Sequence, residues 1–100
     1  MTTSGEQGSD PRAALLECRE IIEELDRRIV ALLAERVTVG LRTAALKQAA
    51  GLPLLDPGRE AEVIRRAVAT ARTHELATEP VREIFWLIVG MSRRAQEEAQ

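Results

Sequence analysis

The chain has 100 residues, which is enough for one small domain but leaves no room for a separate cofactor-binding or regulatory domain. It is 45% hydrophobic and 30% charged, yet Phe85 and Trp86 are its only aromatic residues, so its core is built from aliphatic side chains, which favours helices packed on helices. The net charge of −2 gives no general attraction to nucleic acid or anionic membranes, and a single cysteine and a single histidine exclude an internal disulfide and a recognisable zinc cluster.

The N-terminal part of the chain predicts a disordered leader followed by a long helix. Residues 1–10 are small and polar and lack the basic start and apolar stretch of a secretory signal, so we expect a leader and a cytoplasmic protein. Asp10 before Pro11 is typical of a helix start, with Asp10 as the N-cap. Apolar residues then recur in alternating steps of three and four, as in a helix seam packed against another helix: Leu15, Cys18, Ile22, Leu25, Ile29 and Leu32.

The first helix is expected to extend to about Ala49. Gly40 costs about 1 kcal/mol in a helix relative to alanine, but the apolar spacing resumes after it, and the break comes at residues 51–53. Such a helix is about 60 Å long, which is much longer than a compact domain of this size. We therefore expect it to extend towards a second copy of the chain, because two short helices cannot cover its apolar stripe.

Two shorter helices are predicted in the remainder of the chain, and no strand or internal repeat is indicated. Asp56 caps the second helix, which ends within residues 74–77, and Thr78 is expected to cap the third. Their predicted buried sides are Val63, Ile64, Ala67, Val68 and Ala71 in the second helix, and Ile84, Leu87, Ile88, Met91 and Ala95 in the third. The predicted fold class is all-α, with one long and two shorter helices.

Two cations of the first helix lie on one face. Continuing the seam from Leu32 by four residues gives Arg36, where an apolar residue is expected, and Lys47 follows three turns later. Their backbones are about 16 Å apart, a gap that two extended side chains could narrow around a small dianion. Arg19 lies about 25 Å from Arg36 along the axis, so it could reach such a site only from the partner in an antiparallel dimer. Alone, Lys47 and Arg19 are more simply solvated surface residues, whereas Arg36 on the seam could equally be functional or be an arginine that reaches the surface or pairs with a carboxylate.

Polar groups also gather on the shorter helices. Asp56, Arg59 and Glu60 lie together at the start of the second helix, where an N-cap with an intrahelical ion pair is the simpler explanation. On the third helix, one side changes from apolar to polar along the line Phe85, Val89, Ser92 and Gln96. Its last two members are neutral hydrogen-bonding groups that face inwards, unless the last turn has merely become polar.

Taken together, these residues resemble the all-helical chorismate mutase family. The resemblance extends from about Leu15 to Gln96 and rests on residues 19–22, residues 32–36, Lys47, Asp56 with residues 59–60, and Ser92 with Gln96. It implies a monofunctional isomerase without cofactor or metal, which rearranges chorismate to prephenate in phenylalanine and tyrosine biosynthesis. The mutase domain would span residues 11–100 and form an intertwined helical homodimer. Small members can associate with a separate enzyme of the shikimate pathway, a partner that the sequence leaves open.

The resemblance further implies contacts to a dianionic substrate. The residues matching Arg19, Arg36 and Arg59 help to hold its carboxylates, and Arg19 comes from the partner chain. Those matching Lys47 and Gln96 address the ether oxygen of the bond that breaks. Gln96 can donate a hydrogen bond there at any ordinary pH.

Three more side chains have implied positions. Those matching Asp56 and Glu60 lie near the ring hydroxyl, and Ser92 lies at the pocket wall. The substrate-binding set is therefore Arg19, Arg36, Lys47, Asp56, Arg59, Glu60, Ser92 and Gln96, of which Arg36, Lys47, Glu60 and Gln96 are the expected catalytic groups.

Three other functions stay open. A mutase acting on 4-amino-4-deoxychorismate would use the same fold, and Glu60 could accept a hydrogen bond from a ring amine as well as from a hydroxyl. Isochorismate pyruvate-lyases form a related group that resembles this chain less around residues 59–60. A helical interaction module without activity would have no use for Arg36 on its seam.

Overall fold

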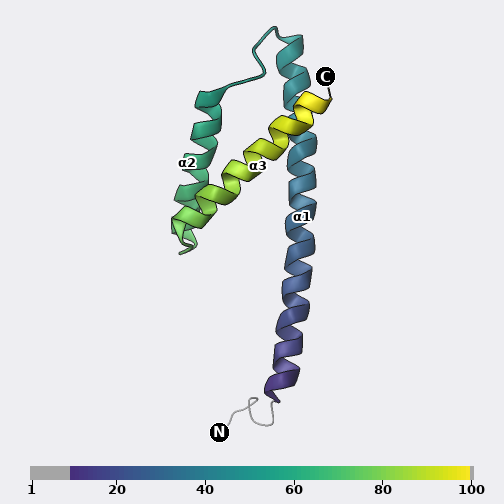
Figure 1. Ribbon diagram of the computed structural model, residues 1–100, viewed down its shortest axis with the longest axis vertical. Coiled ribbons are helices and arrows are strands. Elements are labelled where there is room, and N and C mark those ends of the chain that lie inside the picture. The colour runs from purple at the N-terminus through teal and green to yellow at the C-terminus, as the bar shows by residue number, and fades with distance from the viewer. Residues whose placement is uncertain (1–9, 100) are drawn as a thin grey trace. The chain divides into compact units, whose positions relative to one another are not determined.

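The computed structural model describes residues 10–99, and within this range the chain forms three α-helices and no strand (Figure 1). The helices are α1 (Pro11–Ala49), α2 (Pro57–Thr73) and α3 (Thr78–Glu98). The predicted all-α class, with one long helix before two shorter ones, is confirmed. Apart from Asp10, the predicted leader lies outside the described residues. No helix in the described range is long and apolar enough to cross a membrane.

The start of α1 matches the prediction from sequence. Asp10 accepts a hydrogen bond at Oδ1 from the backbone N–H of Arg12, at 3.1 Å, and so satisfies one of the free donors of the first turn. The helix then continues without interruption through Gly40 to Ala49. The prediction of one helix through Gly40 to about Ala49, which rests on the apolar spacing on both sides of the glycine, is therefore confirmed.

The end of α1 is a Schellman turn built on a glycine. Gly51 has a φ of 72°, a left-handed conformation that glycine adopts at little cost. Its N–H donates to the carbonyl of Gln48 at 3.1 Å, and the N–H of Leu52 donates to the carbonyl of Lys47 at 2.8 Å. These bonds satisfy the last carbonyls of the helix and turn the chain towards α2.

The chain divides into two units, and the boundary falls inside α1: the first unit ends at Leu33 and the second begins at Ala34. The α1 seam of the first unit is exposed, because its large apolar residues, Leu15, Ile22, Leu25, Ile29 and Leu32, keep 44 to 61% of their surface accessible. No residue of α1 is buried. Residues 10–99 of one chain therefore leave the predicted seam uncovered.

The core of the second unit lies between α2 and α3, which pack against each other (Figure 1). Its buried apolar side chains are Ile64, Val68, Ala71 and Val89. The apolar face predicted for α2 is thus confirmed. Asp56 caps α2 as predicted, since its Oδ1 accepts the backbone N–H of Arg59 at 3.0 Å.

The prediction that Thr78 caps α3 is wrong. Thr78 is already the first helical residue, and the N-cap is Ala77, which has φ −60° and ψ 130° and makes no side-chain capping bond. A capping side chain must stand on a residue whose backbone is still non-helical, so the hydroxyl of Thr78 comes one position too late.

The predicted buried side of α3 is also wrong for the single chain. Ile84, Leu87 and Met91 are exposed, whereas Val89 and Ser92 are the buried residues of this helix. Two apolar stripes lie next to each other on α3: the predicted one, and one that contains Phe85, Val89 and Ser92. The stripe with Val89 and Ser92 is the one that packs inside the second unit. Spacing within a single helix cannot distinguish between two such neighbouring stripes.

Candidate active site

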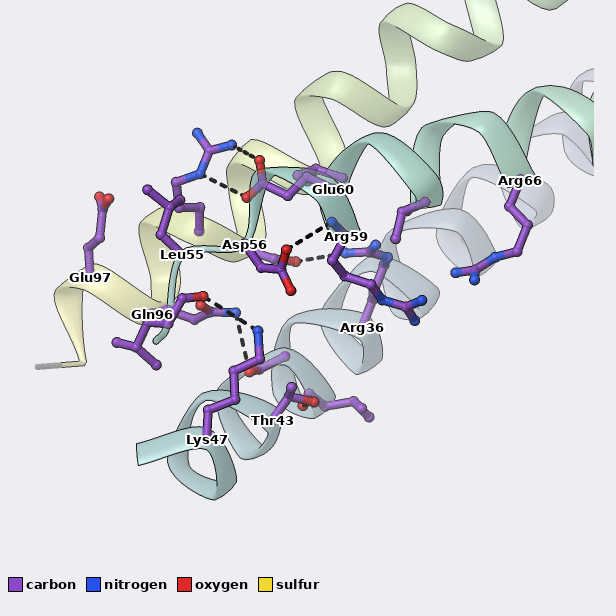
Figure 2. A pocket seen from close by; sticks show the side chains of 17 residues that line it. Arg36, Thr43, Lys47, Leu55, Asp56, Arg59, Glu60, Arg66, Gln96 and Glu97 are labelled. Carbon is purple, nitrogen blue, oxygen red and sulfur yellow. Dashed lines mark hydrogen bonds and ion pairs between the residues drawn. The ribbon is translucent and has the colours of Figure 1, made fainter. Parts of the chain in front are cut away.

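A cavity of about 450 Å³ lies within the second unit, a volume typical of small-molecule sites, which span about 300–1,000 Å³. It is lined by the last turns of α1, the loop and first turns of α2, and the C-terminal half of α3 (Figure 2). Seven of the eight predicted site residues line it: Arg36, Lys47, Asp56, Arg59, Glu60, Ser92 and Gln96. Arg19 is not a lining residue and belongs to the first unit.

Arg36 is held in place by a buried serine. Its Nη1 donates to Oγ of Ser92 at 2.9 Å, and Ser92 is 8% exposed. The arginine that interrupts the apolar seam of α1 therefore points to α3 and not to bulk solvent. A guanidinium has five N–H donors, so this bond leaves others available to a ligand.

Lys47 and Gln96 are both anchored to backbone carbonyls. Nζ of Lys47 donates to the carbonyl of Leu54 at 3.4 Å, and Nε2 of Gln96 donates to the carbonyl of Gly40 at 3.3 Å. Figure 2 shows the ends of both side chains directed into the same space between α1 and α3. An ammonium has three donors and an amide nitrogen has two, so each group keeps at least one N–H for a ligand.

Gly40 lies where α3 comes close to α1. A Cβ at this position would stand 3.5 Å from Nε2 of Gln96 and 3.7 Å from Cβ of Ser92, which is ordinary contact distance. A methyl group would therefore fit, whereas a larger side chain would have to displace the two polar residues of α3. The glycine that appeared in the sequence as a weak point of the helix is part of the cavity wall.

The first turn of α2 places Asp56 and Arg59 at the cavity. The carboxylate of Asp56 caps the helix, as described above, and the guanidinium of Arg59 donates to Oε1 of Glu62 at 2.8 Å. The Arg59 and Glu62 side chains are both more than half exposed, so this ion pair is screened by water and holds Arg59 only weakly. Arg59 can therefore turn towards a ligand at little cost.

Glu60 has a partner that the sequence did not predict. Nη2 of Arg93 donates to its Oε1 at 2.5 Å and Nε donates to its Oε2 at 3.2 Å, which is a two-point guanidinium–carboxylate pair. The Glu60 side chain is 23% exposed and that of Arg93 is 38% exposed. The hydrogen bonds to Glu60, and then the attraction of its charge, raise the pKa of the Arg93 guanidinium, so this group stays charged at any working pH.

Other residues that line the cavity were also not predicted from the sequence, among them Arg66 of α2 and Glu97 of α3. A signal for Arg93 exists, because it lies four residues after Val89 and three before Gln96 and so shares a helix face with them. Its pairing with Glu60 depends on how α2 and α3 are aligned, which the pattern within one helix does not reveal.

The cavity carries more cations than its own carboxylates neutralise. Of the five cationic side chains that line it, Arg59 and Arg93 are in ion pairs. Within residues 10–99, Arg36, Lys47 and Arg66 make no ion pair, since the salt bridges of this range involve other cations. The site is therefore suited to bind a small molecule with two negative charges.

The chain is similar to known proteins over most of its length. Residues 18–97 match the profile of the family described as Chorismate mutase type II. The chain is 29% identical over 84 residues to the chorismate mutase of Methanocaldococcus jannaschii, an alignment that covers 84% of this chain and 85% of that protein.

Bifunctional proteins are also similar to this chain. The bifunctional chorismate mutase/prephenate dehydratase of Escherichia coli (strain K12) is 31% identical over 83 residues, covering 83% of this chain and 22% of that protein. The protein of the same name from Enterobacter agglomerans is 27% identical over 88 residues, covering 88% and 23%. The chain thus spans less than a quarter of the length of these bifunctional relatives. Since the family profile matches most of the chain and includes every predicted site residue, the chain belongs to the chorismate mutase type II family.

Proposed function

We propose that this chain rearranges chorismate to prephenate in the cavity between α1, α2 and α3, as a homodimer with two such sites. The observation that carries the proposal is the placement of Arg36 and Lys47, two cations without an ion-pair partner in the described residues, around one cavity with Gln96. Chorismate is a small dicarboxylate, and a site with unpaired positive charge on its walls matches it.

The reaction requires positioning more than it requires a reactive group. In this one-step pericyclic rearrangement, a C–O bond breaks as a C–C bond forms, and no nucleophile takes part. Arg36 and Arg59 would hold the two carboxylates so that the side chain lies over the ring, which lowers the orientational part of the barrier. The bond from Arg36 to Ser92 supports this role, because it fixes the guanidinium before the substrate binds.

Negative charge develops on the ether oxygen as the C–O bond breaks. Lys47 and Gln96 are directed into one space, and each keeps an N–H that no backbone carbonyl uses. Donors that are already in place stabilise developing charge without reorganisation, and one of them contributes about 3 kcal/mol or more. We propose that these two groups donate to the ether oxygen.

Two carboxylates would recognise the ring hydroxyl. Asp56 and Glu60 both line the cavity from the first turn of α2. A carboxylate can accept about four hydrogen bonds, so Glu60 still has lone pairs for a hydroxyl beside its two bonds to Arg93.

The dimer would complete the site. Arg19 is exposed and lies within the same stretch of α1 as the seam, whose apolar residues lack cover within residues 10–99 of the single chain. A second copy would bury these residues and supply its Arg19 to the substrate carboxylate. This part of the proposal rests on the exposed seam and on the family resemblance.

The proposal is tested by incubating the purified protein with chorismate and following prephenate. Wild type should consume chorismate, and Arg36→Ala should lower kcat/KM by about a hundredfold or more, while circular dichroism shows unchanged helical content. Isochorismate belongs in the same assay to test the lyase alternative. A folded wild-type protein that leaves chorismate unchanged would point instead to a helical interaction module.

A further inference from the structure

We propose that Arg93 sets the substrate specificity of this cavity, making it accept a neutral hydroxyl on the substrate ring and reject an ammonium group at the same position. The inference rests on the proposed function, in which Glu60 lies beside that ring substituent. It deepens that function by separating chorismate from 4-amino-4-deoxychorismate, whose aliphatic amine is protonated at neutral pH.

The geometry makes Arg93 and Glu60 one unit. Both carboxylate oxygens of Glu60 accept from the guanidinium, through Nη2 at 2.5 Å and Nε at 3.2 Å, and the two side chains line the same cavity from opposite helices. In Figure 2 the dashed lines at Glu60 mark these two bonds. The Arg93–Glu60 pair therefore presents a hydrogen-bond acceptor whose negative charge is balanced by a neighbouring positive charge.

This balance affects the two ring substituents differently. A hydroxyl needs only a lone pair, and Glu60 keeps lone pairs beside its two bonds to Arg93. An ammonium group would gain from the full charge of an unpaired carboxylate. Here it would instead lie next to the guanidinium of Arg93, and like charges in such proximity repel each other. Arg93 thus removes the attraction that an isolated Glu60 would offer to a cation.

The other charges of the cavity are of both signs, and they are the same in wild type and in variants of Arg93. Arg36 and Lys47 add positive charge without an ion-pair partner in residues 10–99. Asp56 uses Oδ1 to cap α2. Glu97 lines the cavity but lies one turn further along α3 than Arg93, towards its C-terminal end. Arg93 is therefore the residue whose removal would change the charge beside Glu60 most directly.

The test compares two substrates in matched variants at neutral pH. For wild type, Arg93→Met, Arg93→Lys and Arg94→Met, kcat/KM is measured with chorismate and with 4-amino-4-deoxychorismate. Arg94 is the control, because it is the neighbouring cation, is exposed and does not line the cavity. The ratio of the two kcat/KM values is the readout, since a general loss of structure would lower both values together.

We expect wild type to prefer chorismate, and Arg93→Met to raise the ratio of amine to hydroxyl substrate by about tenfold or more, while Arg93→Lys and Arg94→Met leave it nearly unchanged. If Arg93→Met does not fold, Arg93→Gln removes the same charge and gives the same test. A ratio that stays within about twofold in a folded variant, or a wild type that prefers the amine, would overturn the inference and leave the mutase fold and reaction intact. A wild type that converts neither substrate would instead contradict the proposed function itself.

Discussion

At the scale of single residues, the polar groups of the cavity are held by other parts of the chain. Ser92 accepts from Arg36, the carbonyl of Gly40 accepts from Gln96, and the carbonyl of Leu54 accepts from Lys47. A donor that is fixed before the substrate arrives need not be ordered during the reaction. These three contacts are therefore what a positioning catalyst requires from its own structure.

Gln96 offers the sharpest test at this scale, because one atom can be exchanged without a change of shape. Gln96→Glu replaces a permanent N–H donor by a carboxyl group that donates only when it is protonated. At neutral pH a carboxylate would face both the carbonyl of Gly40 and the developing charge of the ether oxygen. We expect kcat/KM to fall there by about a hundredfold, which corresponds to about 3 kcal/mol.

Activity of Gln96→Glu should rise again as the pH falls, because the introduced carboxyl gains its proton and becomes a donor. The measurement is kcat/KM from about pH 8 to about pH 5, with wild type measured in parallel to correct for other groups that titrate. Circular dichroism at each pH verifies the fold. A variant that matches wild type over the whole range would show that Gln96 does not contact the ether oxygen.

At the scale of whole helices, α1 and α2 end in the same type of turn with different residues at the left-handed position. Gly51 occupies it after α1, and Glu75, with a φ of 59°, occupies it after α2. The second turn has the same hydrogen bonds, from Leu76 N–H to the carbonyl of Ala71 and from Glu75 N–H to that of Arg72. Glycine adopts this conformation more readily than any residue with a Cβ.

Substitutions at these two turns should have opposite effects on stability. Glu75→Gly removes a strained Cβ and should stabilise the chain, whereas Gly51→Ala introduces one and should destabilise it, each by about 1 kcal/mol. Gly58→Ala is the control, because Gly58 lies in the first turn of α2 without a positive φ and with only Asp56 Oδ1 near its side. Urea unfolding at one fixed protein concentration measures all three. Equal effects at Gly51 and Gly58 would contradict the explanation.

The helices show which features of the structure could be predicted from the sequence. The starts of α1 and α2 can be predicted because Asp10 and Asp56 each precede a proline. This pair of residues identifies the first residue of a helix without information from any other segment. The start of α3 was missed by one residue because Ala77 carries no such signal. The inward side of α3 and the partner of Glu60 depend on how separate helices are aligned, and this information is spread over contacts that no single segment contains.

At the scale of the whole molecule, the exposed seam of α1 is the feature that one chain leaves unexplained. Within residues 10–99 only four apolar side chains are buried, Ile64, Val68, Ala71 and Val89. Large apolar residues from Leu15 to Leu32 remain exposed on α1, together with Ile84 and Leu87 on α3. Exposed apolar residues that recur along one helix, as on α1, mark an interface, and a chain of this size gains much of its stability from such burial. We therefore expect a dimer at micromolar concentration, which analytical ultracentrifugation measures directly.

Arg19 allows the dimer and the shared site to be tested together. If each site takes Lys47 from one chain and Arg19 from its partner, Arg19→Ala and Lys47→Ala should each inactivate both sites of a homodimer. In a heterodimer of the two variants, one site would hold both substitutions and the other would hold neither.

Random exchange in an equal mixture makes half of the dimers mixed, and each mixed dimer has one intact site of two. Activity should therefore recover to about a quarter of the wild-type value. Native mass spectrometry of chains that differ in mass verifies the exchange, and Arg19→Ala mixed with Arg19→Ala is the control that should stay inactive. If the mixed dimers form and remain inactive, Arg19 does not serve the partner's site, and the exposed seam of α1 has to be explained by a different assembly.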